Sequence, residues 1–323
     1  MALPGSRESV PLRIAFPWRV VLRAANRKEH DCRWQSYLSY AVTATPRRFL
    51  RIAFVRIGAC RRPYIYNRSF SQKSILERRT PRMEPIYTKN YLITDGMCDR
   101  FCRLKLSQLL TIGQEVAGKH SELLDLSYDF LASRGLFWAV TRHRVEITRL
   151  PTIGETIRVE TWPMPPTKVA FPRSIIAYDE AGKEVFRSIS LWVLMDLEKR
   201  SMIVPGKSGI ALPGTLRGDE LTAPGSLAYH LMGSRESRRV RYTDLDRNGH
   251  MNNTRYLEWV DDLLPSDFHR DHSPKAFTVC YLNESREGDT LLLSWDLDES
   301  LRVEAERAEG GTSHRVFAVK IEY

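Results

Sequence analysis

The feature that most restricts the fold is a repeat, because one order of elements occurs twice along the chain. Gly154-Glu155-Thr156 and Gly288-Asp289-Thr290 occupy equivalent places in the two copies, at an offset of 134 residues. A helix followed by several strands, repeated at one offset, is much stronger evidence for duplication than the short match alone. The chain from residue 83 onward is therefore predicted to form two similar halves.

Apolar spacing predicts a helix over 106–132 in the first half, and in the second half a strand over 238–244 leads to a helix over 254–264. Runs of alternating or β-branched residues predict the strands. These are 137–147, 155–162, 173–179 and 185–196 in the first half, and 276–282, 289–297, 301–308 and 315–323 in the second. DEAG (179–182) is predicted to be a turn between two of them.

One helix followed by long antiparallel strands predicts the hotdog arrangement, in which a curved sheet wraps around a central helix. The fold class is α+β, and the whole is a tandem, or double, hotdog. We assign residues 83–203 to the N-terminal hotdog, 204–237 to a linker rich in Pro and Gly, and 238–323 to the C-terminal hotdog. Two such domains side by side are expected to pair along one edge and to place an active site at the seam.

Residues 1–82 differ from the rest in charge, with 18 Lys and Arg against 4 Asp and Glu. Three interpretations stay open: an organelle transit peptide, a basic arm for a polyanion, or an over-extended gene model in which Met83 is the true start. We expect the protein in the bacterial cytoplasm, or in the plastid stroma if residues 1–82 are a transit peptide. From residue 83 on, 31 basic residues meet 35 acidic ones, so charge favours no nucleic-acid partner.

Composition and motifs exclude several other classes. No apolar run approaches the ~18 residues of a membrane span, so no stable membrane insertion is expected. Five cysteines without a second closely spaced pair predict neither a zinc site nor a disulfide framework. We expect no cofactor and no metal, and a homodimer is left open.

The most unusual stretch is DLDRNGHMNN (244–253), which directly precedes the second predicted helix. Asp246, Asn248 and His250 alternate along it. A helix N-cap needs only one such residue. Here several groups that can donate, accept or carry a proton fall together, which favours a catalytic site over a simple cap.

Two blocks of the chain resemble plant and bacterial acyl-acyl carrier protein thioesterases. These are DLDRNGHMNNTRYLEWV (244–260) and WAVTRHRVEITRLPTIGETIRVETW (138–162), which together with their surroundings span most of residues 83–323. The resemblance implies hydrolysis of fatty acyl-acyl carrier protein, a reaction that releases a free fatty acid and ends chain elongation in fatty acid biosynthesis. It also implies a catalytic set of Asp246, Asn248, His250 and Glu284, the last of these from YLNES (281–285).

The family carries a Cys after this Glu, and Ser285 replaces it here. A mechanism with that Cys as nucleophile cannot operate, so the resemblance leaves a route in which water attacks. As a hypothesis, Glu284 deprotonates the water with His250 as its partner. Asn248 and backbone N–H groups at the helix start polarise the carbonyl, and Asp246 orients Asn248 or His250.

The resemblance further implies that the N-terminal hotdog binds the acyl chain and supplies no catalytic residue. Its helix lead-in LLTIGQEVAGKH (109–120) agrees, since it lacks the Asp-Asn-His set. The candidates for the lining of an acyl tunnel are Leu109, Ile112, Phe137 and Trp138. The candidates for docking the acidic acyl carrier protein are Arg235, Arg238, Arg239 and Arg241.

Two alternatives to this function remain. A related hotdog enzyme could hydrolyse acyl-coenzyme A instead. A hotdog protein could also be a non-catalytic sensor of acyl thioesters with a DNA-binding arm, although residues 1–82 show no helix-turn-helix pattern.

Overall fold

The computed structural model describes residues 21–23, 39–41 and 84–323, and the chain divides into two compact units, 1–77 and 78–323. In the first unit, strand β1 (Val21–Arg23) pairs antiparallel with β2 (Ser39–Ala41). The other predictions made for residues 1–82 fall outside the described residues. No helix in the described ranges is both long and apolar enough to cross a membrane.

The second unit is built on one antiparallel sheet of eleven strands. The strands follow one another in space as β3-β5-β6-β7-β4-β10-β13-β12-β11-β9, and β8 pairs with β7. Their bounds are β3 (Tyr87–Leu92), β4 (Leu136–Ile147), β5 (Thr156–Pro163), β6 (Phe171–Tyr178), β7 (Glu184–Asp196), β8 (Met202–Ile203), β9 (Ser234–Arg239), β10 (Ala276–Tyr281), β11 (Thr290–Leu297), β12 (Ser300–Glu309) and β13 (Thr312–Glu322).

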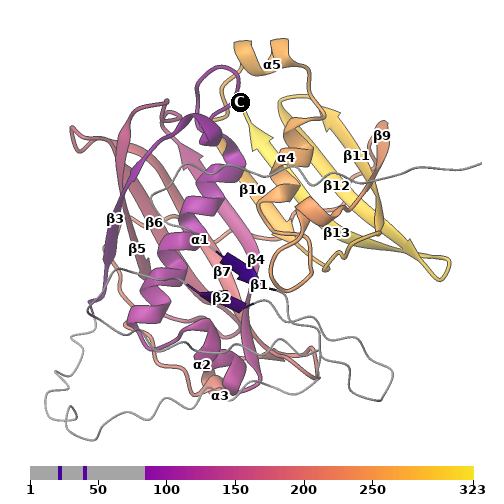
Figure 1. Ribbon diagram of the computed structural model, residues 1–323. Coiled ribbons are helices and arrows are strands. Elements are labelled where there is room, and N and C mark those ends of the chain that lie inside the picture. Colours follow the sequence, from indigo (N-terminus) through magenta and orange to yellow (C-terminus); the bar gives the residue numbers. More distant parts are fainter. Residues whose placement is uncertain (1–20, 24–38, 42–83) are drawn as a thin grey trace, which may run out of the picture. The chain divides into compact units, whose positions relative to one another are not determined.

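Two helices lie side by side across one face of this sheet, α1 over the N-terminal strands and α4 over the C-terminal strands (Figure 1). Each half is therefore a sheet curved around one helix, and the predicted α+β double hotdog is confirmed. The helices are α1 (Leu106–Leu123), α2 (Tyr128–Ser133), α3 (Pro205–Ser208), α4 (Arg255–Asp261) and α5 (Ser266–Asp271), with short 3₁₀ turns at Asp95–Met97 and Tyr242–Asp244.

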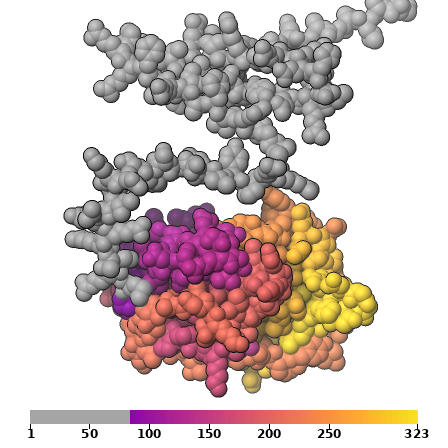
Figure 2. Space-filling view, turned by 90° about the horizontal axis from the view of Figure 1, so that it is seen from below, coloured from indigo at the N-terminus to yellow at the C-terminus, as the bar shows by residue number. Residues whose placement is uncertain are grey.

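The two halves join where β4 pairs with β10. The register runs from Ala276 opposite Glu146 to Cys280 opposite Arg142, so the two sheets continue into one. Figure 2 shows the N-terminal half and the yellow C-terminal half directly adjoining. The expected edge pairing is present.

The repeat is visible at the level of single backbone atoms. Gly154 and Gly288 both have positive φ, +87° and +91°, and each precedes a strand, β5 and β11. The Gly154 N–H donates to the carbonyl of Ile93 at 2.8 Å, and the Gly288 N–H donates to that of Val240 at 3.0 Å. Because glycine adopts this φ without strain, both positions favour glycine in the same turn.

The structure differs from the sequence prediction at several elements, among them β8, α3 and α5, which were not predicted. The helix predicted over 106–132 breaks into α1 and α2, because Asp125 adopts φ +60° and Ser127 caps a new helix by accepting from the Phe130 N–H at 3.2 Å. Strand β3 was not predicted. The strand predicted over 238–244 begins earlier, as β9, inside the segment assigned to the linker, and ends before the 3₁₀ turn at Tyr242–Asp244.

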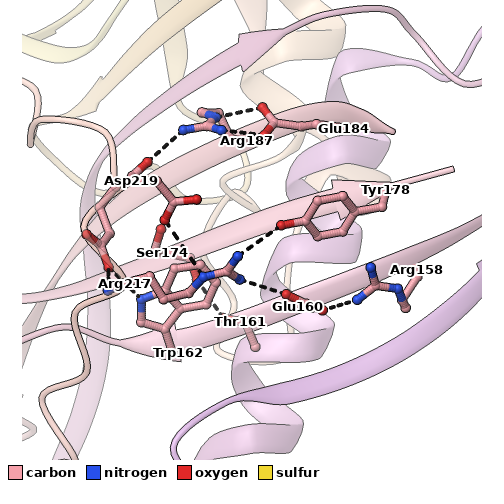
Figure 3. A network of polar contacts seen from close by, with 11 residues as sticks. Arg158, Glu160, Thr161, Trp162, Ser174, Tyr178, Glu184, Arg187, Arg217 and Asp219 are labelled. Atoms are coloured by element: carbon pink, nitrogen blue, oxygen red, sulfur yellow. Dashed lines mark hydrogen bonds and ion pairs between the residues drawn. The ribbon is translucent and has the colours of Figure 1, made fainter. Parts of the chain in front are cut away.

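From residue 215 on, the predicted linker is a strap across the outer face of the sheet, the face opposite α1, whereas Leu212 before it lines a cavity on the inner side. The Arg217 guanidinium donates hydrogen bonds to Glu160 of β5 at 2.8 Å and to the Tyr178 hydroxyl of β6 at 3.3 Å (Figure 3). The Asp219 carbonyl accepts a hydrogen bond from Arg187 of β7 at 2.6 Å. Further along, the strap crosses the seam and reaches the C-terminal half, where the His230 N–H donates to Glu304 at 3.2 Å. The strap thus binds both halves from outside.

Candidate active site

A tight polar turn between β9 and α4 is held by one carboxylate. Asp246 Oδ1 accepts hydrogen bonds from the backbone N–H groups of Asn248 at 2.8 Å and of His250 at 3.2 Å. The Asp246 N–H donates to the His250 carbonyl at 2.8 Å, and Gly249 closes the turn with φ +76°. Asp246 therefore fixes the backbone from which the side chains of Asn248 and His250 project.

The N-terminal half contains the same turn. Asp99 Oδ1 accepts from the N–H groups of Phe101 at 2.8 Å and of Arg103 at 2.9 Å, and the Asp99 N–H donates to the Arg103 carbonyl at 2.7 Å. Cys102 holds the left-handed position with φ +62°. The turn is duplicated together with the fold.

The two turns differ in chemistry, because Phe101 and Arg103 stand where Asn248 and His250 stand in the C-terminal half. From the sequence, this counterpart was expected at 109–120, which the structure shows to be inside α1. The structure places it ahead of α1, with its Asp retained and the other two groups replaced.

Glu284 lies beside His250 and Arg200. His250 Nε2 is 3.3 Å from Glu284 Oε2, and the Arg200 guanidinium forms an ion pair with the same oxygen. The Glu284 carbonyl accepts from Arg307 Nη1 at 2.9 Å, which fixes the loop after β10. Among the described side chains none donates to Glu284 Oε1, so this oxygen is left to bind water.

Neither nearby candidate nucleophile can reach a substrate. Ser285 is fully buried, at 0% exposed, and its hydroxyl lies next to the Tyr256 phenol, whose pKa burial raises to about 12. The Cys280 thiol is also buried, 3.9 Å from the Gly225 carbonyl of the strap. Water is therefore the attacking group that this arrangement supports.

A cavity of about 550 Å³ opens beside the Asp246 turn. Its other walls come from α1, α2, β4, β5, β6 and β7 of the N-terminal half and from Leu212 of the predicted linker. At the junction, the Tyr128 hydroxyl donates to Asn248 Oδ1 at 3.3 Å, and the Arg247 guanidinium stacks 3.6 Å from the Tyr128 ring centroid. The C-terminal half contributes Asp246, Arg247, Asn248, Asn252 and Asn253 to the lining.

Two of the four predicted tunnel residues line this cavity and two do not. Phe137 and Trp138 of β4 are in its wall, where Trp138 packs edge-on against Phe171 at a centroid distance of 4.9 Å. Leu109 and Ile112 lie in the hydrophobic core at 3% and 1% exposed. They project into the core from the first half of α1, whereas the cavity adjoins the second half of this helix.

The four predicted docking arginines are not at the cavity. Arg235, Arg238 and Arg239 lie on β9, the edge strand of the C-terminal half, and Arg241 follows it. Arg238 is already paired with Glu236 at 2.5 Å and with Asp262 at 2.9 Å.

Sequence reasoning missed Arg200. It lies in the turn after β7 with φ +52°, and its guanidinium stacks 5.0 Å from the ring centroid of Phe137, a cavity residue. Arg200 thus connects the cavity wall to Glu284, from a position 84 residues away along the chain. The only sequence signal was its place next to the predicted linker.

Two N–H groups at the start of α4, where an oxyanion was expected to bind, already have acceptors. The Thr254 N–H donates to Asn252 Oδ1 at 3.0 Å, and the Arg255 N–H donates to the Asn252 carbonyl at 2.9 Å. The Asn248 amide is better placed, because it lines the cavity. Its Nδ2 is 3.3 Å from Asp246 Oδ2, and an amide nitrogen carries a second hydrogen.

Known proteins match both halves of the chain. Residues 84–205 match the family model of the acyl-ACP thioesterase N-terminal domain, and residues 232–319 match that of the C-terminal domain. The oleoyl-acyl carrier protein thioesterase of Coriandrum sativum, named as chloroplastic, is 29% identical over 211 residues, 59% of this chain and 57% of that protein. The dodecanoyl-[acyl-carrier-protein] hydrolase of Umbellularia californica is 30% identical over 166 residues, 48% of this chain and 43% of that protein. The chain thus spans little more than half the length of the coriander relative.

Solved structures show the same fold. An acyl-ACP thioesterase from Bacteroides thetaiotaomicron superimposes with a TM-score of 0.65 at 23% identity, over 74% of this chain and 97% of that one. The 12:0-ACP thioesterase from Umbellularia californica gives a TM-score of 0.62 at 23% identity, again over 74% and 97%. With both of its domains matched in order, this chain belongs to the acyl-acyl carrier protein thioesterase family.

Proposed function

We propose that this protein hydrolyses the thioester of a fatty acyl chain carried on acyl carrier protein and releases the free fatty acid. The observation that carries the proposal is the contact between the two halves: the cavity of the N-terminal hotdog has the polar turn Asp246–Asn253 as part of its wall. An acyl chain in the cavity would present its thioester to Asn248. Family membership supports the same reaction.

The proposed mechanism uses water as the nucleophile. Glu284 Oε1 accepts a proton from a water that attacks the thioester carbonyl carbon, while Oε2 remains held by His250 and Arg200. General-base assistance of this kind contributes roughly 10²–10⁴-fold to a rate. Asn248 Nδ2 donates to the oxyanion of the tetrahedral intermediate, a contribution worth about 3 kcal/mol in other enzymes.

Collapse of that intermediate breaks the carbon–sulfur bond. The proton held at Glu284 and His250 passes to the leaving thiolate of the carrier, and the fatty acid departs with the oxygen of the water. Asp246 takes no proton in this scheme. Its role is to hold the turn that aims Asn248 and His250.

The carrier is proposed to dock at the rim of the cavity. Arg247 lines the cavity beside the catalytic turn and is exposed, whereas three of the four predicted docking arginines lie on β9 at the sheet edge. A positive side chain at the rim suits an acidic carrier and speeds encounter. The positive charge of Arg247 at this place supports it as the first docking residue to test.

The test is thiol release by the full chain from one acyl group presented on acyl carrier protein and on coenzyme A. We expect release from both and a kcat/KM at least about tenfold higher on the protein carrier, since only that carrier reaches the rim. Faster turnover of acyl-coenzyme A would favour the alternative enzyme. If thiol is released from neither carrier and the chain binds DNA, the non-catalytic acyl-thioester sensor would replace the proposed enzyme.

The compartment is a separate part of the proposal. The plant relatives carry names that place them in chloroplasts. By analogy, residues 1–82 would direct import into a plastid, and otherwise the enzyme would act in the cytoplasm. A fluorescent protein fused after residue 82 tests this, because organelle accumulation supports import and an even cytoplasmic signal contradicts it.

A further inference from the structure

The side-chain amide of Asn248 is held at both ends, and one of the two groups that hold it comes from the other half of the molecule. Asn248 Nδ2 lies 3.3 Å from Asp246 Oδ2 of the same turn. Asn248 Oδ1 accepts a hydrogen bond from the Tyr128 hydroxyl, also at 3.3 Å. Tyr128 is 120 residues away along the chain and belongs to α2 of the N-terminal hotdog. The hydrolysis proposed above assigns it no role.

The local structure of the N-terminal half places Tyr128 at this junction. Asp125 turns the chain after α1 with φ +60°, and Ser127 caps α2 by accepting from the Phe130 N–H at 3.2 Å. Tyr128 is therefore the first residue of α2, and it lines the cavity. The Arg247 guanidinium lies 3.6 Å from its ring centroid, a cation–π contact that restrains the phenol beside the polar turn.

The two contacts determine which end of the Asn248 amide faces which neighbour. An ionised carboxylate can only accept hydrogen bonds, so Asp246 Oδ2 requires the nitrogen end of the amide. A phenol can donate, and the Tyr128 hydroxyl satisfies the oxygen end. A reversed amide would instead set two acceptor oxygens against each other at Asp246. Asn248 Nδ2 thus keeps one N–H for Asp246 and a second for the cavity, where the thioester oxygen is proposed to lie.

The Tyr128 hydrogen bond also acts on the strength of that second N–H. Hydrogen bonds arranged in a chain polarise and strengthen one another. Here the chain runs from the phenol through the amide to the proposed oxyanion. Among residues 84–323, Tyr128 is the side chain that donates to Asn248 Oδ1. Without its hydroxyl, the amide would be less firmly oriented and a weaker donor.

A contact between a short helix and the turn of the opposite half occurs twice, with different chemistry. Helix α5 follows α4 as α2 follows α1, and the His269 carbonyl of α5 accepts from Arg103 Nη2 of the N-terminal turn at 2.6 Å. Phe101, which stands there in the place of Asn248, has no amide to orient. The short helix thus presents a side-chain donor to the turn that carries an amide, and a backbone acceptor to the turn that does not.

We propose that Tyr128 is a positioning residue for the hydrolysis, and that its hydroxyl orients and polarises the Asn248 amide. The inference rests on the proposed hydrolysis and adds a residue to its machinery. The N-terminal hotdog then acts on the oxyanion donor and not only on the acyl chain. A contact across the seam would in this way join acyl binding in one half to the chemistry of the other.

The experiment is a double-substitution cycle on the full chain, measured with the saturated acyl-acyl carrier protein that the unsubstituted chain hydrolyses fastest. Tyr128→Phe keeps the ring that contacts Arg247 and removes only the hydroxyl. We expect kcat to fall about three- to tenfold, the effect of one lost hydrogen bond, with KM changed by less than about twofold. In an Asn248→Ala background, which is slower from the start, Tyr128→Phe should change kcat by less than about twofold, because the amide on which Tyr128 acts is gone.

Tyr229→Phe is the matched control. Tyr229 lies on the strap, is 55% exposed, and its ring also faces a guanidinium, that of Arg315, at 5.6 Å. Removal of this hydroxyl should leave kcat and KM as they are in the unsubstituted chain. Thermal melting of each variant checks that the fold is retained, as expected for a half-exposed phenol.

An unchanged kcat in Tyr128→Phe would overturn the role of Tyr128. An equal fall with and without the Asn248 amide would also overturn it, since Tyr128 would then act independently of that amide. A raised KM with kcat intact would assign Tyr128 to acyl binding instead. All three results leave the proposed hydrolysis standing. An unsubstituted chain that releases no thiol from any acyl-acyl carrier protein would remove the hydrolysis and the role of Tyr128 together, so the two failures are distinguishable.

Discussion

His250 Nε2 lies 3.3 Å from Glu284 Oε2, and this contact joins the duplicated turn to the loop that follows β10. The same carboxylate oxygen is bound by Arg200 from the N-terminal half. Glu284 is therefore held from both halves of the molecule, although it is close to neither partner in sequence. The predicted catalytic residues and the missed Arg200 meet at this one carboxylate.

Glu284→Gln should lower kcat by roughly 10²–10⁴-fold, because the amide cannot take a proton from water. The fold should persist, since the Glu284 side chain is exposed, and thermal melting checks this. Ser285→Ala is the neighbouring control and should be mild, as that hydroxyl is buried away from the cavity. Near-normal turnover by the Gln variant would remove Glu284 from the mechanism.

Arg200→Met should lower kcat by about tenfold with little change in KM. The reason is that Glu284 loses a charged partner that restrains its carboxylate, while the cavity keeps its shape. Lys199→Met, one residue earlier and also exposed, is the control and should behave as the unchanged protein. A raised KM with kcat intact would instead assign Arg200 to carrier binding.

Asp99→Ala and Asp246→Ala separate the structural role of the turn from its chemical role. Each carboxylate accepts two backbone N–H bonds, so each substitution should cost about 1–2 kcal/mol in the free energy of unfolding. Only Asp246→Ala should also reduce kcat, since only that turn carries Asn248 and His250. Denaturant unfolding and turnover, measured on both variants, decide this. Equal losses of activity would show that the N-terminal turn takes part in the reaction.

Ala117→Leu should shift turnover toward shorter acyl chains. Ala117 lines the cavity from α1 at 6% exposed, and the larger side chain fills space that the acyl chain would use. Lys119→Leu, on the same helix but exposed and outside the lining, should leave the chain-length profile as it was. A profile unchanged in both variants would mean that the acyl chain lies elsewhere.

His143→Leu should make the protein less sensitive to acid. His143 of β4 is 2% exposed, both ring nitrogens lack partners among the described residues, and burial lowers its pKa from 6.5 to about 4. Between these values the unfolded chain binds a proton that the folded chain does not. Stability is therefore lost as pH falls from about 6.5 to 4, by about 3 kcal/mol in total.

The variant should lose less stability over that range, as denaturant unfolding at both pH values would show. His314→Leu, exposed near the start of β13, is the control. An acid sensitivity that stays the same in His143→Leu would mean that other groups set it.

Much of the fold was predictable from sequence because its strands are long and alternate clearly. Strand β7, Glu184–Asp196, is the best example. Strand β3 was missed because it is short and mostly exposed, so it has no apolar period. The break in the predicted helix depends on the left-handed conformation of Asp125, which residue type alone does not impose.

The residues of the candidate site also fall into those that the sequence could predict and those that it could not. That Asp246, Asn248 and His250 lie together could be predicted because they are close in sequence, and the structure places Glu284 beside His250. Arg200 was not predictable, because its importance comes from the carboxylate of Glu284, which tertiary packing brings to it. Leu109 and Ile112 have the right residue type but pack in the hydrophobic core and do not line the 550 Å³ cavity.

Because the turn is duplicated, its two copies can be compared within one molecule. A symmetric dimer of single hotdogs must present identical residues at both of its equivalent sites. Two hotdogs in one chain are free of that constraint, so Phe101 and Arg103 can stand at one turn where Asn248 and His250 stand at the other. The N-terminal turn thus has the same backbone geometry with different side chains. Grafting an Asn-Gly-His sequence into it would test whether this geometry alone is enough to build a second site.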